Sequence, residues 1–288
     1  MSATLAADLG GTKTLVALVE DGRVRERRLL PTDRDGGPDC WTRRLAEAAA
    51  AWQGVWDRVG VAVTGAVRGG TWSALNPGTL PIPEAYPLAR RLHDLLGCEP
   101  VLVNDAQAAA WGEYVAGAGR GRDMAFLTVS TGIGGGLVLG GRLVRGHRGL
   151  GGSFGQMPGA DGVRAEDLAS GRAIAEAAAR AGHPVEAPAV FAAAEAGEAW
   201  AEAVVSRAAV ALARLCRAVL FAADPEVIVL GGGVGLAAGH LERVAAEMES
   251  WPAWQRPVLR RAALGPEAGV IGVAALAAAA EQHRERQG

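Results

Sequence analysis

Apolar and polar positions alternate so that the same strand pattern is predicted twice along the chain. The first occurrence comprises three strand-like runs near the N-terminus: Thr4–Asp8, Thr14–Glu20 and Val24–Leu30. The second begins with the apolar run Met124–Ser130 and continues in two short apolar segments joined at Gly140-Gly141. Asp21-Gly22 and Gly140-Gly141 are strong signals for tight hairpin turns. The sequence therefore predicts two related halves, each opening with a three-stranded β-meander.

Outside these meanders, the hydrophobic spacing changes between helical and strand periods. We expect helices over Pro38–Gln53, Pro87–Leu96, Ala106–Val115, Arg164–Ala181, Pro188–Ala196, Glu198–Ala222, Leu236–Glu249 and Ala268–Arg286. We expect further strands over Arg58–Thr64, Pro100–Val103, Glu226–Leu230 and Pro257–Ala262. The proline-rich segment Ser73–Pro87 is expected to be irregular. Strands alternating with helices in each half predict an α/β protein with mostly parallel strands flanked by helices.

Length, charge and cysteine content limit the function classes. The chain has 288 residues, a net charge of −2 and a pI of about 6.2, which gives no indication of nucleic-acid or anionic-membrane binding. No apolar stretch is long enough to span a membrane, and Asp8 interrupts the N-terminal apolar run, so we expect no signal peptide. Because the three cysteines are odd in number and far apart, we expect reduced thiols and a cytoplasmic protein.

Two glycine-rich turns are candidates for phosphate binding. Ser130–Gln156 holds eleven glycines in 27 residues, and its first part is Ser130-Thr-Gly-Ile-Gly-Gly-Gly136. The first half has a counterpart at Asp8–Lys13, where a strand runs into Gly10-Gly11. Glycines leave backbone N–H groups bare at a tight turn, and such a concavity can hold a phosphate. A glycine-rich hairpin without a ligand is the alternative for Ser130–Gln156 alone, whereas the two related turns together indicate a clamp around a nucleotide.

Carboxylates at the ends of predicted strands are the candidate catalytic groups. Asp8 stands beside the candidate phosphate-binding turn at Gly10-Gly11, where it can hold Mg²⁺ directly or through water. Alternatively, it is an N-cap or turn aspartate with no ligand. Lys13 either meets a phosphate or is solvated. Asn104-Asp105 follows a strand and opens a helix. Asp105 is therefore either a general base for a hydroxyl that attacks a γ-phosphate or the N-cap of the helix.

Three further positions have weaker signals. Gly231-Gly-Gly233 follows a strand, and the helix after it can present N–H groups to a nucleotide. Glu166 begins a helix, where a carboxylate also stabilises the first turn without any ligand. His147 lies inside the glycine-rich stretch, and a ligand role for it stays open.

Taken together, these motifs resemble those of the ROK sugar kinases (repressor, open reading frame, kinase). The motifs that carry the resemblance occur in the family's order and spacing: Asp8-x-Gly-Gly-Thr-Lys13, Asn104-Asp105, Ser130-Thr-Gly-x-Gly-Gly-Gly136 and Gly231-Gly-Gly233. Within the family, the chain is most similar to the bacterial N-acetylmannosamine kinases. The stretches behind that similarity are Leu75–Pro77, Val103–Tyr114, Val129–Gly136 and Gly233–Ala238.

The resemblance implies a fold, an activity and a set of partners. The fold is that of the actin-like ATPases (ribonuclease H-like), with two similar lobes around a cleft for nucleotide and sugar. The N-terminal lobe would comprise residues 1–116 plus 268–288, and the C-terminal lobe residues 117–267. The implied activity is transfer of the γ-phosphate of ATP, with Mg²⁺, to the 6-hydroxyl of a hexose. N-acetylmannosamine is the expected hexose, which implies a role in carbohydrate metabolism, in sialic acid catabolism. The family commonly forms dimers, so a homodimer is expected.

The resemblance also implies roles for individual residues. Asp105 would be the catalytic base, and Asp8 would hold Mg²⁺. The implied sugar-binding residues are Gly65, Asn76, Asn104, Asp105, Gln156 and Glu166. The implied nucleotide-binding residues are Asp8, Gly10, Gly11, Thr12, Lys13, Thr131, Gly132, Gly231, Gly232 and Gly233.

The chain departs from the family pattern in two related places. Where the family has Glu-x-Gly-His after the glycine-rich hairpin, the matching residues are Ser153 and Gln156. The three cysteines of the family's zinc motif are also missing, because Asp161-Gly-Val-Arg-Ala165 stands at their place. A site without thiolate or imidazole has nothing to hold Zn²⁺, so we predict no zinc. Gln156 can keep a sugar contact, whereas a contact at Ser153 is lost or bridged by water.

Other functions remain to be weighed against this one. A glucokinase or an N-acetylglucosamine kinase is the alternative within the same chemistry. From another class, a ROK-type repressor would carry a DNA-binding segment before the first lobe, but a strand is predicted already at about Thr4. A sugar-binding relic without catalysis is disfavoured because Asp8 and Asp105 are both present.

Overall fold

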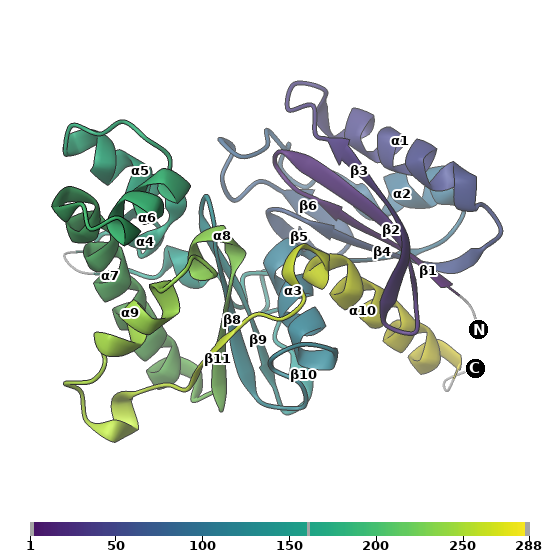
Figure 1. The fold of residues 1–288 in the computed structure, drawn as a ribbon. Helices are drawn as coiled ribbons and strands as arrows, with labels where there is room; N and C mark the ends of the chain where they lie inside the picture. Colours follow the sequence, from purple (N-terminus) through teal and green to yellow (C-terminus); the bar gives the residue numbers. More distant parts are fainter. Residues whose placement is uncertain (1–2, 160–161, 286–288) are drawn as a thin grey trace. The chain divides into compact units, whose positions relative to one another are not determined.

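Both β-meanders are present, and each forms one side of a five-stranded sheet (Figure 1). The computed structural model describes residues 3–159 and 162–285. The first sheet, in the order β3-β2-β1-β4-β7, consists of β1 (Ala3–Leu9), β2 (Lys13–Glu20), β3 (Arg23–Pro31), β4 (Trp56–Val63) and β7 (Pro100–Asn104). The second, in the order β10-β9-β8-β11-β12, consists of β8 (Met124–Val129), β9 (Ile133–Leu139), β10 (Arg142–Leu143), β11 (Val227–Gly231) and β12 (Leu259–Arg261). In each sheet the meander strands are antiparallel and the remaining pairs are parallel, so the internal repeat extends to the whole sheet.

The hairpin turns of the two meanders have the backbone conformation that their sequences predict. Asp21 and Gly22 have φ of 50° and 73°, and Gly140 and Gly141 have φ of 54° and 72°. Two consecutive residues with positive φ define the turn type whose twist matches that of the flanking strands. The two meanders therefore turn in the same way.

The helices occur where helical spacing is found, with several shorter than expected. They are α1 (Gly37–Ala49), α2 (Leu88–Leu96), α3 (Asp105–Val115), α4 (Glu166–Ala169), α5 (Gly171–Arg180), α6 (Ala187–Glu195), α7 (Ala199–Ala223), α8 (Gly232–Gly235), α9 (His240–Ala246) and α10 (Ala268–Glu285). The expected helix Arg164–Ala181 is wrong as one element. Ser170 is extended there (φ −75°, ψ 165°), and its hydroxyl caps α5 by accepting a hydrogen bond from Ala173 N. Likewise, Gly239 with φ of 68° separates α8 from α9.

One small hairpin was not expected. β5 (Ala66–Arg68) and β6 (Thr71–Ser73) pair antiparallel directly after β4 and precede the irregular proline-rich segment. Gly69 and Gly70 form its turn with φ of 55° and 80°. Strands of three residues give too short an alternation to be recognised in the sequence.

The chain divides into two compact units that match the two sheets. The first unit comprises residues 1–116, 145–151 and 266–288, and the second comprises residues 117–144 and 152–265. The last helix, α10, belongs to the first unit, so that unit is built from separate parts of the chain. The segment Arg145–Gly151 also packs with the first unit, which differs from the lobe boundaries expected from sequence.

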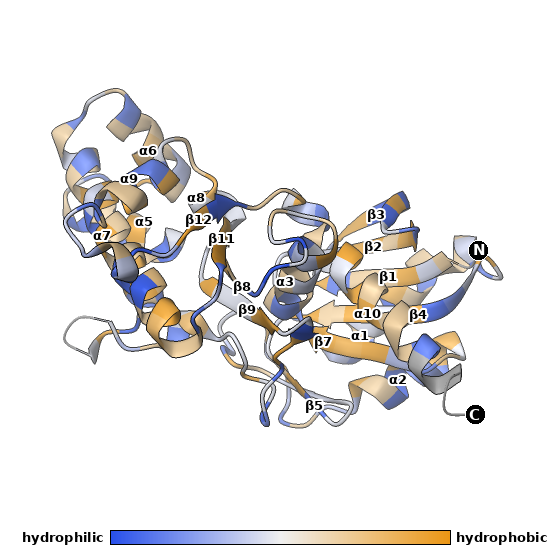
Figure 2. Cartoon of the chain, turned by 90° about the horizontal axis from the view of Figure 1, so that it is seen from below, coloured by the Kyte–Doolittle hydropathy of each residue, from blue (hydrophilic) through white to orange (hydrophobic). Residues whose placement is uncertain are grey.

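In the first unit, the sheet is covered by helices on both faces. Leu5, Ala7 and Leu9 of β1 are buried on the face where α1 contributes Trp41 and Leu45. Alternation along a strand points Ala6 and Asp8 to the opposite face, which α10 covers. The central strands of this sheet are largely hydrophobic in Figure 2, as expected for strands buried on both faces. Asp8 is thus a carboxylate facing a helix.

In the second unit, one long helix organises the core. α7 spans 25 residues and buries a stripe that includes Val204, Leu212 and Val219 against α4, α5, α6 and α9. Ile228 and Leu230 of β11 belong to the same core. Within the described part of the chain, no helix has both the length and the apolar character that a membrane-crossing helix needs.

Candidate functional site

In the first unit, the turn after β1 is held in one conformation by hydrogen bonds. Gly10 N donates to Lys13 O at 3.1 Å, and the Thr32 hydroxyl donates to Gly10 O at 2.9 Å. Thr12 and Lys13 are exposed at the tip of this turn. A fixed turn with exposed N–H groups is compatible with the phosphate contacts expected of it.

Asn104, the last residue of β7, begins α3 and caps it. Its Oδ1 accepts hydrogen bonds from Ala106 N at 3.0 Å and Gln107 N at 3.2 Å, and its Nδ2 donates to Gly65 O at 2.9 Å. The sequence left open whether Asp105 is the N-cap, and the cap is Asn104 instead. Asn104 satisfies the helix N-terminus, and the Asp105 carboxylate accepts hydrogen bonds from Ala106 N at 2.8 Å and from the Asn104 side chain. Asp105 is therefore not explained by capping alone.

Asp8 and Asp105 influence each other electrostatically. Burial, and after it the charge of Asp105, raises the pKa of Asp8 to about 7, against the lowering effect of Lys13. Burial also raises the pKa of Asp105 to about 6, against the lowering effect of its hydrogen bonds. Both residues remain partly accessible to solvent. Two carboxylates that repel each other near neutral pH are typical of a site that binds a cation or moves a proton.

Gly65 and Asn76 lie in the same unit as this pair, and Gly65 O contacts the Asn104 side chain. Gly65 has φ of +100°, and a Cβ there would lie 2.5 Å from Ser73 O, so the backbone itself requires glycine. Asn76 is exposed and its Oδ1 accepts a hydrogen bond from Gly78 N at 3.0 Å, which forms a turn. The loop after Asn76 packs against the turn after β1. A Cβ on Gly11 would lie only 2.7 Å from Thr79 Cγ2.

The sequence analysis missed the contribution of α10 to this site. A Cβ on Gly269, at the start of α10, would lie 2.5 Å from Asp8 Oδ2, so only a glycine leaves room for the carboxylate. Farther along, a Cβ on Gly272 would overlap the Ala108 carbonyl, and one on Gly112 would overlap the Ala268 carbonyl. The backbones of α3 and α10 therefore touch. The signal in the sequence was Gly269 and Gly272 within an otherwise alanine-rich helix.

Gln107 is a second residue that the sequence analysis missed. Its side chain is buried in α3, and its Nε2 donates to Gly151 O at 2.7 Å and lies 3.3 Å from Gly149 O. Gln107 thereby fastens Arg145–Gly151 to the helix that starts at Asp105. His147 lies in this segment and is exposed, with no role assigned by the geometry. A glutamine among four alanines of a helix was the available signal.

In the second unit, the turn after β8 has a carboxylate over it. Ser130 N donates to Gly132 O at 2.9 Å, and Ile133 N donates to Glu166 Oε2 at 2.9 Å. A Cβ on Gly132 would lie 2.7 Å from the same Glu166 oxygen. The structure thus brings together Thr131, Gly132 and Glu166. While Glu166 keeps this position, the Ile133 N–H is not available to a phosphate.

The glycines after β11 are explained in part by packing. A Cβ on Gly231 would lie 2.9 Å from the Phe126 ring, and Gly232 has φ of +83°, where a Cβ would overlap the Val129 carbonyl. A Cβ on Gly233 would meet no atom within 4 Å, and Gly233 is exposed. The helix that follows, α8, is only four residues long. Gly231 and Gly232 are therefore needed to bring β11 and β8 together, whereas packing does not require a glycine at position 233.

A family comparison decides how these sites are to be interpreted. The sequence profile described as the ROK family matches residues 4–280, which is nearly the whole chain. The chain belongs to the ROK family. This confirms the resemblance inferred from the four motifs.

Individual ROK proteins agree in sequence and in fold. The N-acetylmannosamine kinase of Citrobacter koseri is 43% identical over 285 residues, which cover 95% of this chain and 98% of that protein. The bifunctional enzyme NanE/NanK of Brucella melitensis is 52% identical over 280 residues, which cover 96% of this chain but 54% of that protein. This chain therefore spans about half the length of the Brucella protein. The crystal structure of a ROK hexokinase from Thermus thermophilus superimposes with a TM-score of 0.83 and 35% identity, covering 98% and 99% of the two chains. The fold is accordingly the actin-like ATPase fold of the ROK sugar kinases.

The residues at the place of the family's zinc motif do not fit a zinc ion. Gln156 offers a neutral amide whose Oε1 already accepts a hydrogen bond from the Arg164 cation at 3.1 Å. Gly162–Ala165 contains neither cysteine nor histidine, and Asp161 lies outside the described residues. Among residues 3–159 and 162–285, no group of three His, Cys, Asp or Glu side chains could hold a metal ion. The absence of zinc stays a prediction, supported by this donor chemistry.

Proposed function

We propose that this ROK protein is an ATP-dependent hexose kinase that phosphorylates the 6-hydroxyl of N-acetylmannosamine. The observation that carries the proposal is the pair Asn104-Asp105. Asn104 caps α3 and leaves the Asp105 carboxylate free of that task, with a pKa raised by burial to about 6. The choice of sugar rests on the 43% identity to the Citrobacter enzyme over the full length of both proteins.

In this proposal Asp105 acts as the general base. It takes the proton of the sugar 6-hydroxyl while the oxygen attacks the γ-phosphorus, and the bond from that phosphorus to the bridging oxygen breaks to release ADP. A base works best when its pKa lies near the working pH, and a pKa of about 6 leaves most of Asp105 ionised at neutral pH. Positioning by the capped helix and by Gln107 supports the same role.

Mg²⁺ fits the first-unit site. Asp8 and Asp105 offer carboxylate oxygens, and their mutual repulsion is the condition that a divalent cation relieves. We assign Asp8 to Mg²⁺, directly or through water. When bound, the ion would neutralise charge on the phosphates of ATP. We assign no zinc, and elemental analysis that finds stoichiometric zinc would contradict this.

The substrate contacts follow the sequence assignments. We propose Gly65, Asn76, Asn104, Gln156 and Glu166 for the sugar, in addition to Asp105. For ATP we propose Gly10, Gly11, Thr12, Lys13, Thr131, Gly132, Gly231, Gly232 and Gly233, in addition to Asp8. Of the sugar residues, Asn104 already uses its amide oxygen for α3 and its amide nitrogen for Gly65 O and the Asp105 carboxylate.

We further propose a homodimer in the cytoplasm that serves sialic acid catabolism. None of the three cysteines forms a disulfide, which is compatible with a reducing compartment. Analytical ultracentrifugation at micromolar concentration should give twice the mass of the 29.5 kDa chain. A single species at the monomer mass would contradict the dimer.

A coupled assay of ADP release over a panel of hexoses tests the proposed activity. The panel contains N-acetylmannosamine, N-acetylglucosamine, glucose and mannose, each with ATP and Mg²⁺. We expect the highest kcat/KM for N-acetylmannosamine, and NMR of the product should show the phosphate on O6. A preference for glucose or N-acetylglucosamine would favour the alternative kinases. ATP binding without turnover on any sugar would contradict a kinase and favour a sugar-binding regulator.

A further inference from the structure

Gln156 and Arg164 lie at the two ends of a short closed loop in the second unit. Gln156 ends a 3₁₀ turn, Phe154–Gln156, and the strand-like pair Pro158 and Arg164 follows it. Ala165 N donates to Met157 O at 3.0 Å, which closes the loop. The backbone thus brings Arg164 next to Gln156, although Arg164 comes eight positions later in the sequence.

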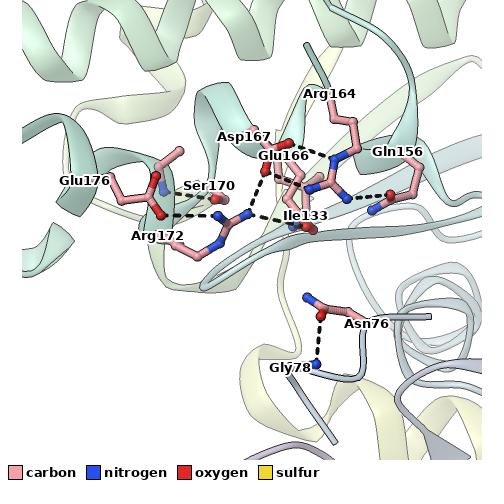
Figure 3. Close-up of polar contacts among 11 residues, drawn as sticks. Asn76, Gly78, Ile133, Gln156, Arg164, Glu166, Asp167, Ser170, Arg172 and Glu176 are labelled. Carbon is pink, nitrogen blue, oxygen red and sulfur yellow. Dashed lines mark hydrogen bonds and ion pairs between the residues drawn. The ribbon is translucent and has the colours of Figure 1, made fainter. Parts of the chain in front are cut away.

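Arg164 is held in place by a carboxylate. Its Nε donates to Asp167 Oδ2 at 2.7 Å and its Nη2 donates to Asp167 Oδ1 at 3.0 Å, a bidentate pair. Its remaining terminal nitrogen, Nη1, donates to Gln156 Oε1 at 3.1 Å (Figure 3). One guanidinium therefore joins α4 to the side chain at the end of the 3₁₀ turn.

A second arginine fixes the carboxylate. Arg172 Nη2 donates to Asp167 Oδ1 at 2.7 Å, and its Nη1 pairs with Glu176 at 3.2 Å (Figure 3). Hydrogen bonds from Arg164, and then from Arg172, lower the pKa of Asp167, so it stays charged. These side chains are partly exposed, and an isolated pair would contribute little. In a network, each added partner meets a side chain that is already ordered.

The chemistry of Arg164 determines which end of the Gln156 amide it contacts. A guanidinium has only donors, so the amide must turn its oxygen toward Arg164 and its NH₂ group away. The NH₂ group has only donors as well, and Gln156 is exposed. It can therefore receive only an acceptor oxygen of a ligand, such as a sugar hydroxyl or an acetamide carbonyl.

We propose that Arg164 is a positioning residue that orients the Gln156 amide, so that its NH₂ group donates a hydrogen bond to an acceptor oxygen of the sugar. The inference rests on the proposed kinase function and deepens it. Arg164 touches neither sugar nor phosphate in this account. The effect of Arg164 reaches the substrate through Gln156 alone.

The test uses three variants of the full chain: Arg164→Lys, Gln156→Leu and the double variant. A lysine keeps the charge but cannot bind Asp167 with two nitrogens and Gln156 with a third. We expect Arg164→Lys to raise the KM for the sugar about three- to tenfold, as for loss of one hydrogen bond, with kcat and the KM for ATP within about twofold. The double variant should have the sugar KM of Gln156→Leu, because Arg164 acts only through that side chain.

Arg207→Lys is the matched control. Arg207 is an exposed arginine of α7 that makes no hydrogen bond or ion pair recorded among the described residues. Its replacement should leave all kinetic constants unchanged, and thermal unfolding of each variant reports any general loosening. A sugar KM within twofold of wild type for Arg164→Lys would overturn the inference. So would effects of the two single changes that multiply in the double variant. Absence of turnover in the wild-type protein would instead refute the proposed function.

Discussion

The two halves share one strand order, but the residue that precedes each first turn differs. Asp8 is the next-to-last residue of β1, and Thr128 has the same place in β8. Both turns contain three residues, Gly10–Thr12 and Ser130–Gly132. In the first half a carboxylate thus comes from the strand itself. In the second, the carboxylate over the turn comes from Glu166, on α4.

Because of this difference, the same strand order carries different chemical groups in the two halves. The first turn lies beside Asp8 and Asp105, two carboxylates with raised pKa. Repulsion between them suits a cation and a transferable proton. The carboxylate over the second turn is already hydrogen-bonded to Ile133 N. We infer that proton transfer and metal binding belong to the first half, while the second half contributes binding groups.

Asp8→Asn breaks this asymmetry at the proposed metal site, and its effect on activity is expected to be second only to that of Asp105→Asn. An amide is a weaker ligand for Mg²⁺ than a carboxylate, so kcat/KM should fall about 10- to 100-fold, with partial recovery at high Mg²⁺. ADP release measured over a range of Mg²⁺ concentrations checks this. Thr128→Val, at the equivalent position of the second half, is the control. The assignment fails if both variants have the same Mg²⁺ dependence as wild type.

Gly272→Ala should loosen the helix contact beneath the base. A methyl group would meet the Ala108 carbonyl where α3 and α10 touch. We expect a loss of about 1–3 kcal/mol in stability, against the usual gain of about 1 kcal/mol for Gly→Ala within a helix. Denaturant unfolding gives the value. Ala279→Val adds volume on the exposed face of the same helix and should be nearly neutral; equal losses in both variants would speak against a backbone contact.

Gly132→Ala tests the carboxylate of the second half. The new methyl group would lie 2.7 Å from Glu166 Oε2 and force that side chain aside. Since the obstacle is the end of a flexible side chain, stability should change by less than about 1 kcal/mol. The sugar KM should rise about three- to tenfold if Glu166 binds sugar. Unchanged kinetics would remove Glu166 from the list of sugar ligands.

The smallest expected effect is on stability as a function of pH. The pKa of Asp105 is raised from 3.8 to about 6 in the folded protein, so ionisation of this group destabilises the fold as pH rises through that interval. The full shift corresponds to about 3 kcal/mol, of which we expect about a third because Asp105 is partly accessible to solvent. Asp105→Asn should therefore be more stable than wild type at pH 8 by about 1 kcal/mol, and the gain should vanish near pH 4. Thermal unfolding at both pH values measures this. A gain that is the same at pH 4 and pH 8 would show that the carboxylate is not strained by burial.

The sequence predicted what depends on local patterns. The meanders, the turns Asp21-Gly22 and Gly140-Gly141, and the order of helices and strands follow from periodicity and turn chemistry. Asp8 and Asp105 could be found because each stands where a predicted strand ends. Helix ends were less accurate, since Ser170 divides one predicted helix through a cap that needs tertiary packing to form.

What the sequence could not provide involves segments far apart in the chain. Gly269 matters because its missing side chain makes room for Asp8, some 260 residues earlier. Gln107 matters because its side chain donates hydrogen bonds to carbonyls of Arg145–Gly151, some 40 residues later in the chain. The choice between Asn104 and Asp105 as helix cap depended on the Gly65 carbonyl, which orients the Asn104 amide. None of these relations leaves a periodic signal.

The division of tasks between the halves is tested most directly by comparing Asp105→Asn with Glu166→Gln. Steady-state ADP release with N-acetylmannosamine gives kcat, and calorimetry gives sugar affinity. We predict that Asp105→Asn lowers kcat by about 10²- to 10⁴-fold with sugar affinity little changed, because a general base is lost and the helix cap at Asn104 remains. Glu166→Gln should instead weaken sugar binding and retain most of kcat. Turnover that survives in Asp105→Asn, or that collapses only in Glu166→Gln, would contradict the account.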